Sequence, residues 1–162
     1  MPQVVLDHFK RAAGDIGAHG DNDTLPFDID IRFVKENEDT LAGLAFDYFQ
    51  KLEHSGSPTA KKEIASLQVF SERLLVPTGP AGFRITTKIH PFWNIYINGL
   101  GIAIAGIHEP IRSGQVHSYR FASNGNSIFD RNASWRAFRE ATIADSLSAG
   151  EDAIIVQTDS LF

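Results

Sequence analysis

Apolar residues recur along this chain with two different periods, which together predict a helix-rich protein containing a few strands. From Asn37 they return every three or four positions, and Glu38 and Asp39 occupy the first turn, where the helix dipole favours acids. This spacing predicts an amphipathic helix with an apolar face made of Leu41, Leu44, Ala45, Tyr48, Phe49 and Leu52. Upstream, a short helix is expected near Val4 to Ala13, followed by an irregular loop rich in glycine and aspartate.

A break at residues 54–58 separates the helix after Asn37 from a second predicted helix that closes near Pro77. One face of this second helix is expected to carry Ile64, Leu67, Phe70, Ser71 and Leu74. The two helices together predict an antiparallel helix pair over residues 37–76. A turn is expected at residues 78–82, and the alternation in Phe83–Ile89 predicts a strand.

The stretch from Pro91 to Ile107 is the longest apolar run, and proline suits the first position of a helix. It falls short of the roughly 18 to 20 apolar residues that span a bilayer, so it predicts a buried helix, ending between His108 and Pro110. Glycines within it lack the context of a dinucleotide-binding loop and predict close helix packing instead; they are Gly99, Gly101 and Gly106.

Shorter elements are predicted in the last third of the chain. Strands are predicted at residues 116–122 and 153–159. Between them, a turn is predicted at 124–126 and a helix over 135–147. The inward side of that helix is predicted to carry Trp135, Phe138, Ile143 and Leu147. The fold class expected is therefore α+β, with a helical N-terminal region followed by a mixed helix and strand unit.

Composition narrows the chemistry. The chain has 162 residues, of which 43% are hydrophobic and 22% charged, enough to bury the core of one domain. It has no cysteine, which excludes disulfides, thiolate zinc sites and a cysteine nucleophile, and which is compatible with a reducing cytoplasm. No secretory signal precedes the first helix, and the six histidines form no metal-binding motif. No Gly-x-Ser-x-Gly motif supports hydrolase chemistry.

Charge is distributed unevenly along the chain. Residues 1–72 carry a net charge of −6, residues 73–139 a net charge of +6, and residues 140–162 a net charge of −5. Seven of the eight central bases are arginines, namely Arg73, Arg84, Arg112, Arg120, Arg131, Arg136 and Arg139. The guanidinium fork suits bidentate contact with phosphate, so this region is compatible with nucleic-acid binding. Alternatively, the arginines pair with the surplus carboxylates on either side.

Four segments occur in an order that resembles bacterial reverse transcriptases, in particular their retron-like, defence-associated branch. They are Pro91-Phe92-Trp93-Asn94-Ile95-Tyr96; His117-Ser118-Tyr119-Arg120-Phe121; Ile128-Phe129-Asp130 with Trp135 and Phe138; and Ala153-Ile154-Ile155-Val156-Gln157-Thr158-Asp159. The resemblance covers about residues 90–159. It implies that residues 1–89 form a helical leader region and residues 90–162 a partial fingers unit with the first palm strand.

The resemblance also implies roles for individual residues. Asp159, at the end of the first palm strand, would be the first metal-binding aspartate and would bridge two Mg²⁺ ions in the complete enzyme. Tyr119 and Arg120 would lie on a finger strand facing template or incoming nucleotide, with Arg112 and Arg120 as the leading candidates for phosphate contact. The implied partner is an RNA or DNA template–primer in the cytoplasm, with a role in antiviral defence.

The sequence departs from the family after Asp159. Reverse transcriptases continue with a hydrophobic residue and a Phe-Tyr pair, whereas Ser160, Leu161 and Phe162 follow here, and no later Asp-Asp pair is present. Two Mg²⁺ ions need a second carboxylate, so we expect this chain by itself to bind no Mg²⁺ stably and not to polymerise nucleotides. It is then the leader and fingers portion of a reverse transcriptase, most simply a truncated gene product or a fragment; a third possibility is that it docks onto a separately encoded palm and thumb. The alternative is a small, non-catalytic module that binds a protein or nucleic acid, with an apolar groove in the helix pair over 37–76 and structural arginines.

Overall fold

The computed structural model describes residues 3–19, 24–67, 71–77, 82–114, 120–122, 127–130, 133 and 135–149. Within these ranges it contains six α-helices, one short 3₁₀ turn and one antiparallel sheet of two strands, so the helix-rich α+β class is confirmed. The predicted turn at 124–126, the predicted strand at 153–159, and most of the predicted turn at 78–82 and of the predicted strand at 116–122 lie outside the described residues.

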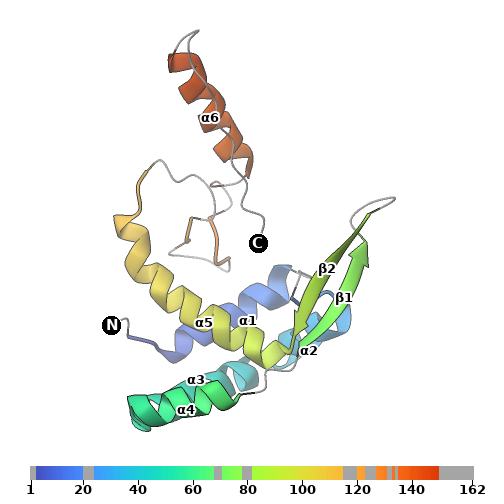
Figure 1. Ribbon diagram of the computed structural model, residues 1–162, viewed down its shortest axis with the longest axis vertical. Helices are drawn as coiled ribbons and strands as arrows, with labels where there is room; N and C mark the ends of the chain where they lie inside the picture. Colours follow the sequence, from blue (N-terminus) through green and yellow to red (C-terminus); the bar gives the residue numbers. More distant parts are fainter. Residues whose placement is uncertain are drawn as a thin grey trace.

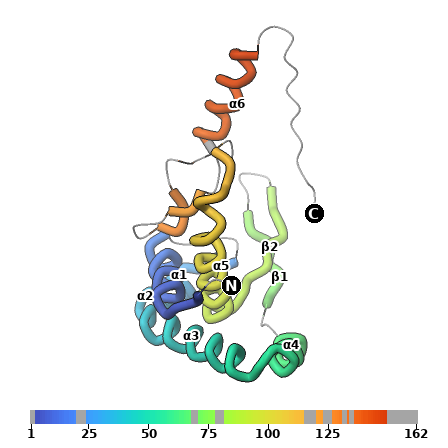
Figure 2. Tube along the Cα trace, turned by 90° about the vertical axis from the view of Figure 1, so that its left-hand side faces the viewer, coloured from blue at the N-terminus to red at the C-terminus, as the bar shows by residue number. Residues whose placement is uncertain are grey.

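The elements form a helical cluster from which a hairpin and one helix project (Figure 1). In chain order they are α1 (Leu6–His19), α2 (Asp28–Glu36), α3 (Glu38–His54), α4 (Ser57–Ser66), β1 (Ser71–Pro77), β2 (Phe83–Ile89), α5 (Pro91–His108), η1 (Glu109–Ile111) and α6 (Trp135–Ala149). Helices α1, α3 and α5 pack against one another, whereas α6 stands apart in both views (Figures 1 and 2). The packed core therefore draws on residues from both sides of position 89.

The centre of the core is Phe9 on α1, which is fully buried. Its ring centroid lies 6.0 Å from that of Phe46 and 5.9 Å from that of Tyr96, so it joins α1 to α3 and to α5. Opposite this ring stands Gly99, where an added Cβ would come 2.4 Å from Phe9 Cδ1. The predicted close packing is confirmed at Gly99. It is wrong at Gly101 and Gly106, because a Cβ at either would meet no atom within 4 Å.

Helix α1 is longer than predicted, and α2 was not predicted at all. Glycines at positions 14 and 17 suggested an early end, but α1 continues through both to His19. A Cβ on Gly17 would come 3.4 Å from Lys35 Cβ and 2.7 Å from the flexible end of Glu38, so this glycine lies where α1 passes close to the junction of α2 and α3. Helix α2 follows Phe27 and buries Ile31 and Val34 against that cluster.

The predicted antiparallel helix pair over 37–76 is wrong in its second half. Helix α3 confirms the first member, but α4 ends at Ser66 and its cap residue Leu67 is extended. Residues 71–77 form strand β1 instead, paired with β2 so that Leu74 lies opposite Thr86 and Leu75 opposite Ile85. Pairing with a strand about ten residues downstream overrides the helical spacing of the apolar residues, because tertiary partners outweigh local propensity.

Helices α5 and α6 occur where they were predicted, but they are less buried than expected. Helix α5 begins at Pro91, ends at His108 and buries one face, whereas Ile97 and Ile104 on another face are each about half exposed. On α6 the predicted inward orientation is wrong for Phe138, Ile143 and Leu147, which are 37%, 52% and 78% exposed. Among the described residues, no helix combines the length and apolar character that crossing a membrane requires.

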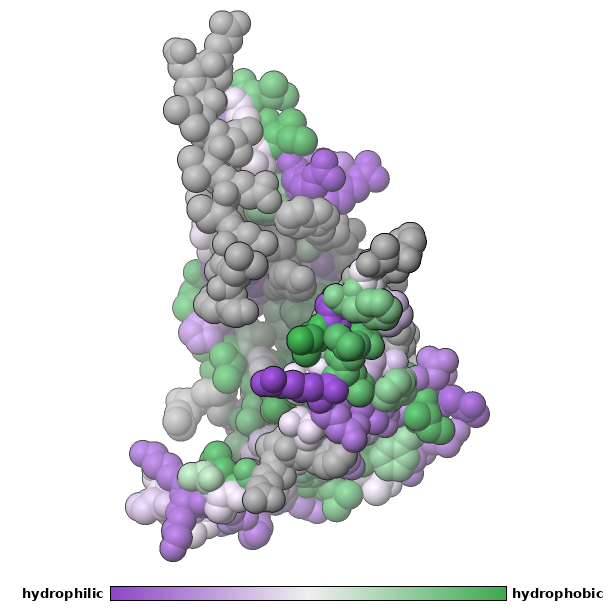
Figure 3. Space-filling model, turned by 45° about the vertical axis from the view of Figure 1, so that its right-hand side comes forward, coloured by the Kyte–Doolittle hydropathy of each residue, from purple (hydrophilic) through white to green (hydrophobic). Residues whose placement is uncertain are grey.

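The hairpin of β1 and β2 has one partly covered face and one exposed face. On the inner face Thr86 is buried, and Lys88 Nζ lies 2.9 Å from Asp30 Oδ2, which fastens β2 to α2. The outer face carries Leu75, Phe83 and Ile85, each at least 70% exposed. Figure 3 shows hydrophobic surface gathered on the side of the molecule that carries this hairpin.

Candidate functional site

Two of the arginines predicted to contact phosphate converge on one carboxylate at the end of α5. Glu109 Oε1 lies 2.7 Å from Arg120 Nε, and Glu109 Oε2 lies 3.1 Å from Arg112 Nη1. The main-chain N–H of Phe121 also donates to Oε2, at 3.0 Å. Arg120 is held a second time, because its Nη1 donates to the carbonyl of Ser113 at 2.9 Å. We call Glu109, Arg112 and Arg120 the arginine cluster.

The arginine cluster has a net charge of +1, since one carboxylate faces two guanidinium groups. The hydrogen bond from the Phe121 N–H, together with the bond and charge of Arg112 and the charge of Arg120, lowers the pKa of the Glu109 carboxyl below its ordinary value. Burial acts in the opposite direction and is outweighed. Glu109 is therefore ionised at neutral pH, and the three charges are fixed.

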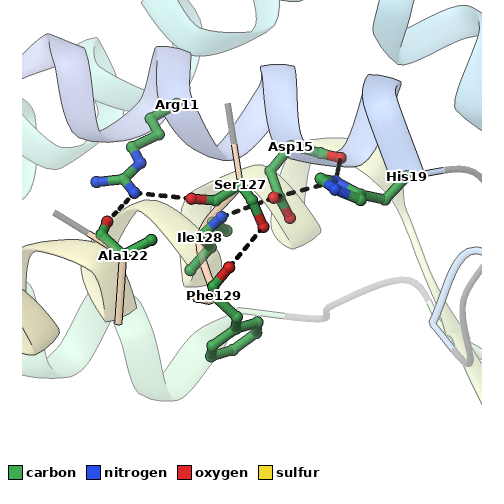
Figure 4. A network of polar contacts seen from close by, with 7 residues as sticks. All are labelled: Arg11, Asp15, His19, Ala122, Ser127, Ile128 and Phe129. Carbon is green, nitrogen blue, oxygen red and sulfur yellow. Dashed lines mark hydrogen bonds and ion pairs between the residues drawn. The ribbon is translucent and has the colours of Figure 1, made fainter. Parts of the chain in front are cut away.

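A second set of polar contacts, drawn in Figure 4, holds residues 120–122 and 127–130 against α1. Arg11 Nη2 donates to the carbonyls of Ala122 and of Ser127, the latter at 2.8 Å. Asp15 Oδ1 accepts the main-chain N–H of Ile128 at 2.8 Å. Arg11 and Asp15 are one helical turn apart on α1, so both point toward the same segment. We call residues 120–122 and 127–130 the docked segment.

The docked segment is a short antiparallel pairing. Phe121 and Phe129 form a β-bridge, and the Ala122 N–H donates to the Ile128 carbonyl at 2.9 Å. The Asp130 N–H donates to the Arg120 carbonyl at 2.8 Å, so the backbone of Arg120 is part of this pairing. The Arg11 guanidinium also stacks 4.7 Å from the centre of the Phe121 ring. Arg120 is thus placed by contacts that begin on α1, more than a hundred residues earlier in the chain.

A cavity of about 750 Å³ lies between α1, α5 and the docked segment. Its walls are largely apolar, with Ile16, Ile102 and Ile128 among them, and Glu109 and Arg112 of the arginine cluster line it as well. Cavities of this size and character are typical of small-ligand sites. Glu109 and Arg112 give this otherwise largely apolar space a charged edge.

The arginines of the middle third have different surroundings. On α6, Arg136 Nε lies 2.7 Å from Glu140 Oε1, and both side chains are mostly exposed. Such exposed pairs contribute little to stability. Arg112 and Arg120 are only 28% and 26% exposed. The alternative explanation, pairing with the surplus carboxylates on either side of the basic region, is found at Arg136, whereas Arg112 and Arg120 pair with Glu109 inside that region and are partly buried.

The other predicted site residues cannot be placed in this geometry. Tyr119 and Asp159 both lie outside the described residues. In the part of the chain that is described, no group of three or more His, Cys, Asp or Glu side chains could hold a metal ion.

Sequence reasoning missed three residues of the site, namely Arg11, Asp15 and Glu109. For Glu109 a local signal exists, because Arg112 follows it by three residues at the end of a helix, which is the spacing of a side-chain pair. For Arg11 and Asp15 the signal is weaker. They share one helix face distinct from the apolar face of α1, but nothing local indicates that their partners are residues 122, 127 and 128.

Comparisons of this chain with protein-family models, with curated proteins and with solved structures find no match. A functional proposal therefore rests on the geometry of the site and on the resemblance of the four ordered segments.

Proposed function

We propose that this chain binds the phosphate backbone of RNA or DNA through Arg112 and Arg120, as the leader and fingers portion of a reverse transcriptase. The observation that carries the proposal is the arginine cluster. Two arginines that the resemblance singled out for phosphate contact lie on one carboxylate, beside a cavity large enough for a small ligand. Paired guanidinium groups are a common means of recognising phosphate oxygens.

Charge also supports a polyanionic partner. The region from residue 73 to residue 139 has a net charge of +6, although the whole chain has a net charge of −5. An acidic protein approaches nucleic acid only through a local basic surface, because phosphate contacts provide most of the affinity. The arginine cluster lies within this basic region.

The proposal does not include polymerisation by this chain. In the complete enzyme Asp159 would be one ligand of the Mg²⁺ ions that activate the primer hydroxyl. The sequence supplies no Asp-Asp pair to complete that ligand set, so the residues present do not fit a two-ion site and we derive no step through the metal.

Fluorescence anisotropy with a labelled single-stranded RNA, measured over a series of salt concentrations, tests the proposal. We expect affinity to fall as salt rises, because bound phosphates release counterions. Arg112→Ala and Arg120→Ala should each weaken binding and lower the salt slope by about 1. Arg32→Ala, an exposed arginine on α2 in the acidic part of the chain, is the matched control and should change neither.

Loss of binding counts only if the variants fold, which far-ultraviolet circular dichroism and thermal melting establish. Binding that is absent in the unaltered chain would refute the proposal. So would folded Arg112→Ala and Arg120→Ala variants that bind as the Arg32→Ala control does.

A second candidate function is a protein-binding module, and a specific observation favours it. The outer face of the hairpin exposes Leu75, Phe83 and Ile85 next to one another, and contiguous exposed apolar surface often marks a protein interface. This surface differs from the groove over 37–76 expected from the sequence, because β1 replaces the end of the predicted helix pair. A folded chain that shows no salt-dependent affinity for RNA or DNA would favour this function.

A further inference from the structure

We infer that Glu109 is a positioning residue for phosphate binding: it strengthens the binding of nucleic acid although its own charge repels a polyanion. This inference rests on the proposed function and concerns the same site. It assigns to an acidic residue an effect opposite to the one that its charge alone predicts. The geometry of the arginine cluster leads to this assignment.

The two arginines reach Glu109 from separate pieces of backbone. Arg112 directly follows η1, whereas Arg120 belongs to the docked segment. Two guanidinium groups repel each other, and the repulsion is stronger where water is partly excluded. The Glu109 carboxylate takes one arginine on each of its oxygens, at 2.7 and 3.1 Å, and so offsets that repulsion. Arg120 also donates to the carbonyl of Ser113, but Glu109 is the side chain that bonds both guanidinium groups.

Glu109 is itself held in one orientation. Its carboxylate accepts the Phe121 N–H at 3.0 Å, and its side chain is only 18% exposed. A carboxylate fixed by a main-chain donor can fix its charged partners in turn, because charge-assisted hydrogen bonds are short and directional. Arg112 and Arg120 nevertheless keep about a quarter of their side-chain surface in contact with solvent. The guanidinium groups are thus oriented before a phosphate arrives, which lowers the entropy cost of binding.

Electrostatics and positioning make opposite predictions for removal of this carboxylate. Glu109→Ala makes the chain one unit more positive, so electrostatics alone predicts tighter binding of RNA. If Glu109 positions the arginines, the same substitution lets them separate and weakens binding. The sign of the change therefore decides between the two.

The experiment measures RNA affinity of the full chain by fluorescence anisotropy with a labelled single-stranded RNA. We expect Glu109→Ala to bind roughly tenfold more weakly, which corresponds to losing one charge-assisted contact, and to show a shallower salt slope. The matched control is Glu140→Ala, which removes the partner of Arg136 from an exposed pair and causes the same change in net charge. Glu140→Ala should bind slightly more tightly. A folded Glu109→Ala variant that binds as tightly as Glu140→Ala would overturn the inference.

Glu109→Gln keeps the inference testable if Glu109→Ala fails to fold. Its amide oxygen can still accept the Phe121 N–H, but it can no longer hold two arginines with a full negative charge. Its affinity should lie between those of the unaltered chain and Glu109→Ala, and tighter binding than the unaltered chain would refute positioning. The two proposals fail in different ways. If the unaltered chain does not bind RNA, the proposed function is wrong; if Arg112→Ala and Arg120→Ala weaken binding while Glu109→Gln tightens it, only this inference is wrong.

Discussion

The helical core and the docked segment are held together by different forces. In the core, α1, α3 and α5 meet through buried apolar side chains around Phe9, which has no exposed surface. The docked segment buries Ile128 in the core and packs Phe121 against it, and in addition Arg11, Asp15 and Glu109 each bond its backbone. The core therefore depends on apolar burial, which is non-directional, whereas the docked segment depends also on hydrogen bonds, which are directional.

This difference separates stability from function in the molecule. Apolar burial provides most of the free energy of folding, so the core should determine whether the chain folds. The polar contacts each contribute less, but they determine where the backbone of Arg120 lies and hence whether the arginine cluster forms. Substitutions in the two regions should therefore have different consequences, and the following predictions test that separation.

The largest effect is expected from Phe9→Ala. Truncating a fully buried phenylalanine should lower the free energy of unfolding by about 3–5 kcal/mol, through lost burial and the cavity left behind. Urea denaturation followed by circular dichroism measures this change. Phe83→Ala is the control, because Phe83 is 71% exposed and its truncation should change stability by no more than about 0.5 kcal/mol. Equal losses in both variants would mean that the core is not centred on Phe9.

Gly99→Ala tests how tightly α1 and α5 pack. The added Cβ would come 2.4 Å from the Phe9 ring, and relieving that overlap should cost about 1–3 kcal/mol of stability. Gly101→Ala, two residues along the same helix, is the matched control, because a Cβ there meets nothing within 4 Å. It should instead stabilise the chain by roughly 0.5–1 kcal/mol, since alanine favours helix over glycine. Thermal melting of the two variants should shift in opposite directions.

Asp15→Ala should loosen the docked segment and leave the core intact. The substitution removes the acceptor of the partly buried Ile128 N–H, and loss of such a partner costs about 1 kcal/mol. Hydrogen exchange should therefore become faster at the Ile128 amide while amides in α1 and α5 keep their protection. Asp47→Ala, at an exposed position on α3, controls for loss of a carboxylate. Equal acceleration throughout the core would show that the two regions unfold together.

The smallest effect concerns pH. Because the folded state lowers the pKa of Glu109, this carboxylate adds stability above its ordinary value of 4.5, and that stability is lost as pH falls through the folded pKa. Both arginine partners stay charged throughout. The difference in unfolding free energy between the unaltered chain and Glu109→Gln should therefore be constant near neutral pH and shrink below about pH 4.5. A difference that persists in acid would mean that the Glu109 charge adds nothing.

Local sequence patterns correctly predicted the helices and strands in which those patterns are pronounced. Helix α3 has regularly spaced apolar residues and acids in its first turn, and α5 begins at Pro91. Strand β2 has an alternating sequence that follows a predicted turn. The same rules failed at α1, which continues past the glycines that suggested its end. They also failed at Leu74, where helical spacing of apolar residues predicted a helix but the residues form strand β1. In the site, the resemblance singled out Arg112 and Arg120 from seven arginines, but Glu109 was not predicted to be the group that joins them.

The sequence by itself determined the helix-rich α+β class, most element positions and a basic middle third, because periodicity, caps and composition act within a few residues. Only the tertiary structure decided that residues 71–77 pair with β2 and that Gly17 and Gly99 sit at close helix contacts. It also decided that Arg11 and Asp15 reach a segment more than a hundred residues away. Such contacts depend on which surfaces meet in the folded chain. Residues close to each partner in the sequence therefore carry no pattern that predicts them.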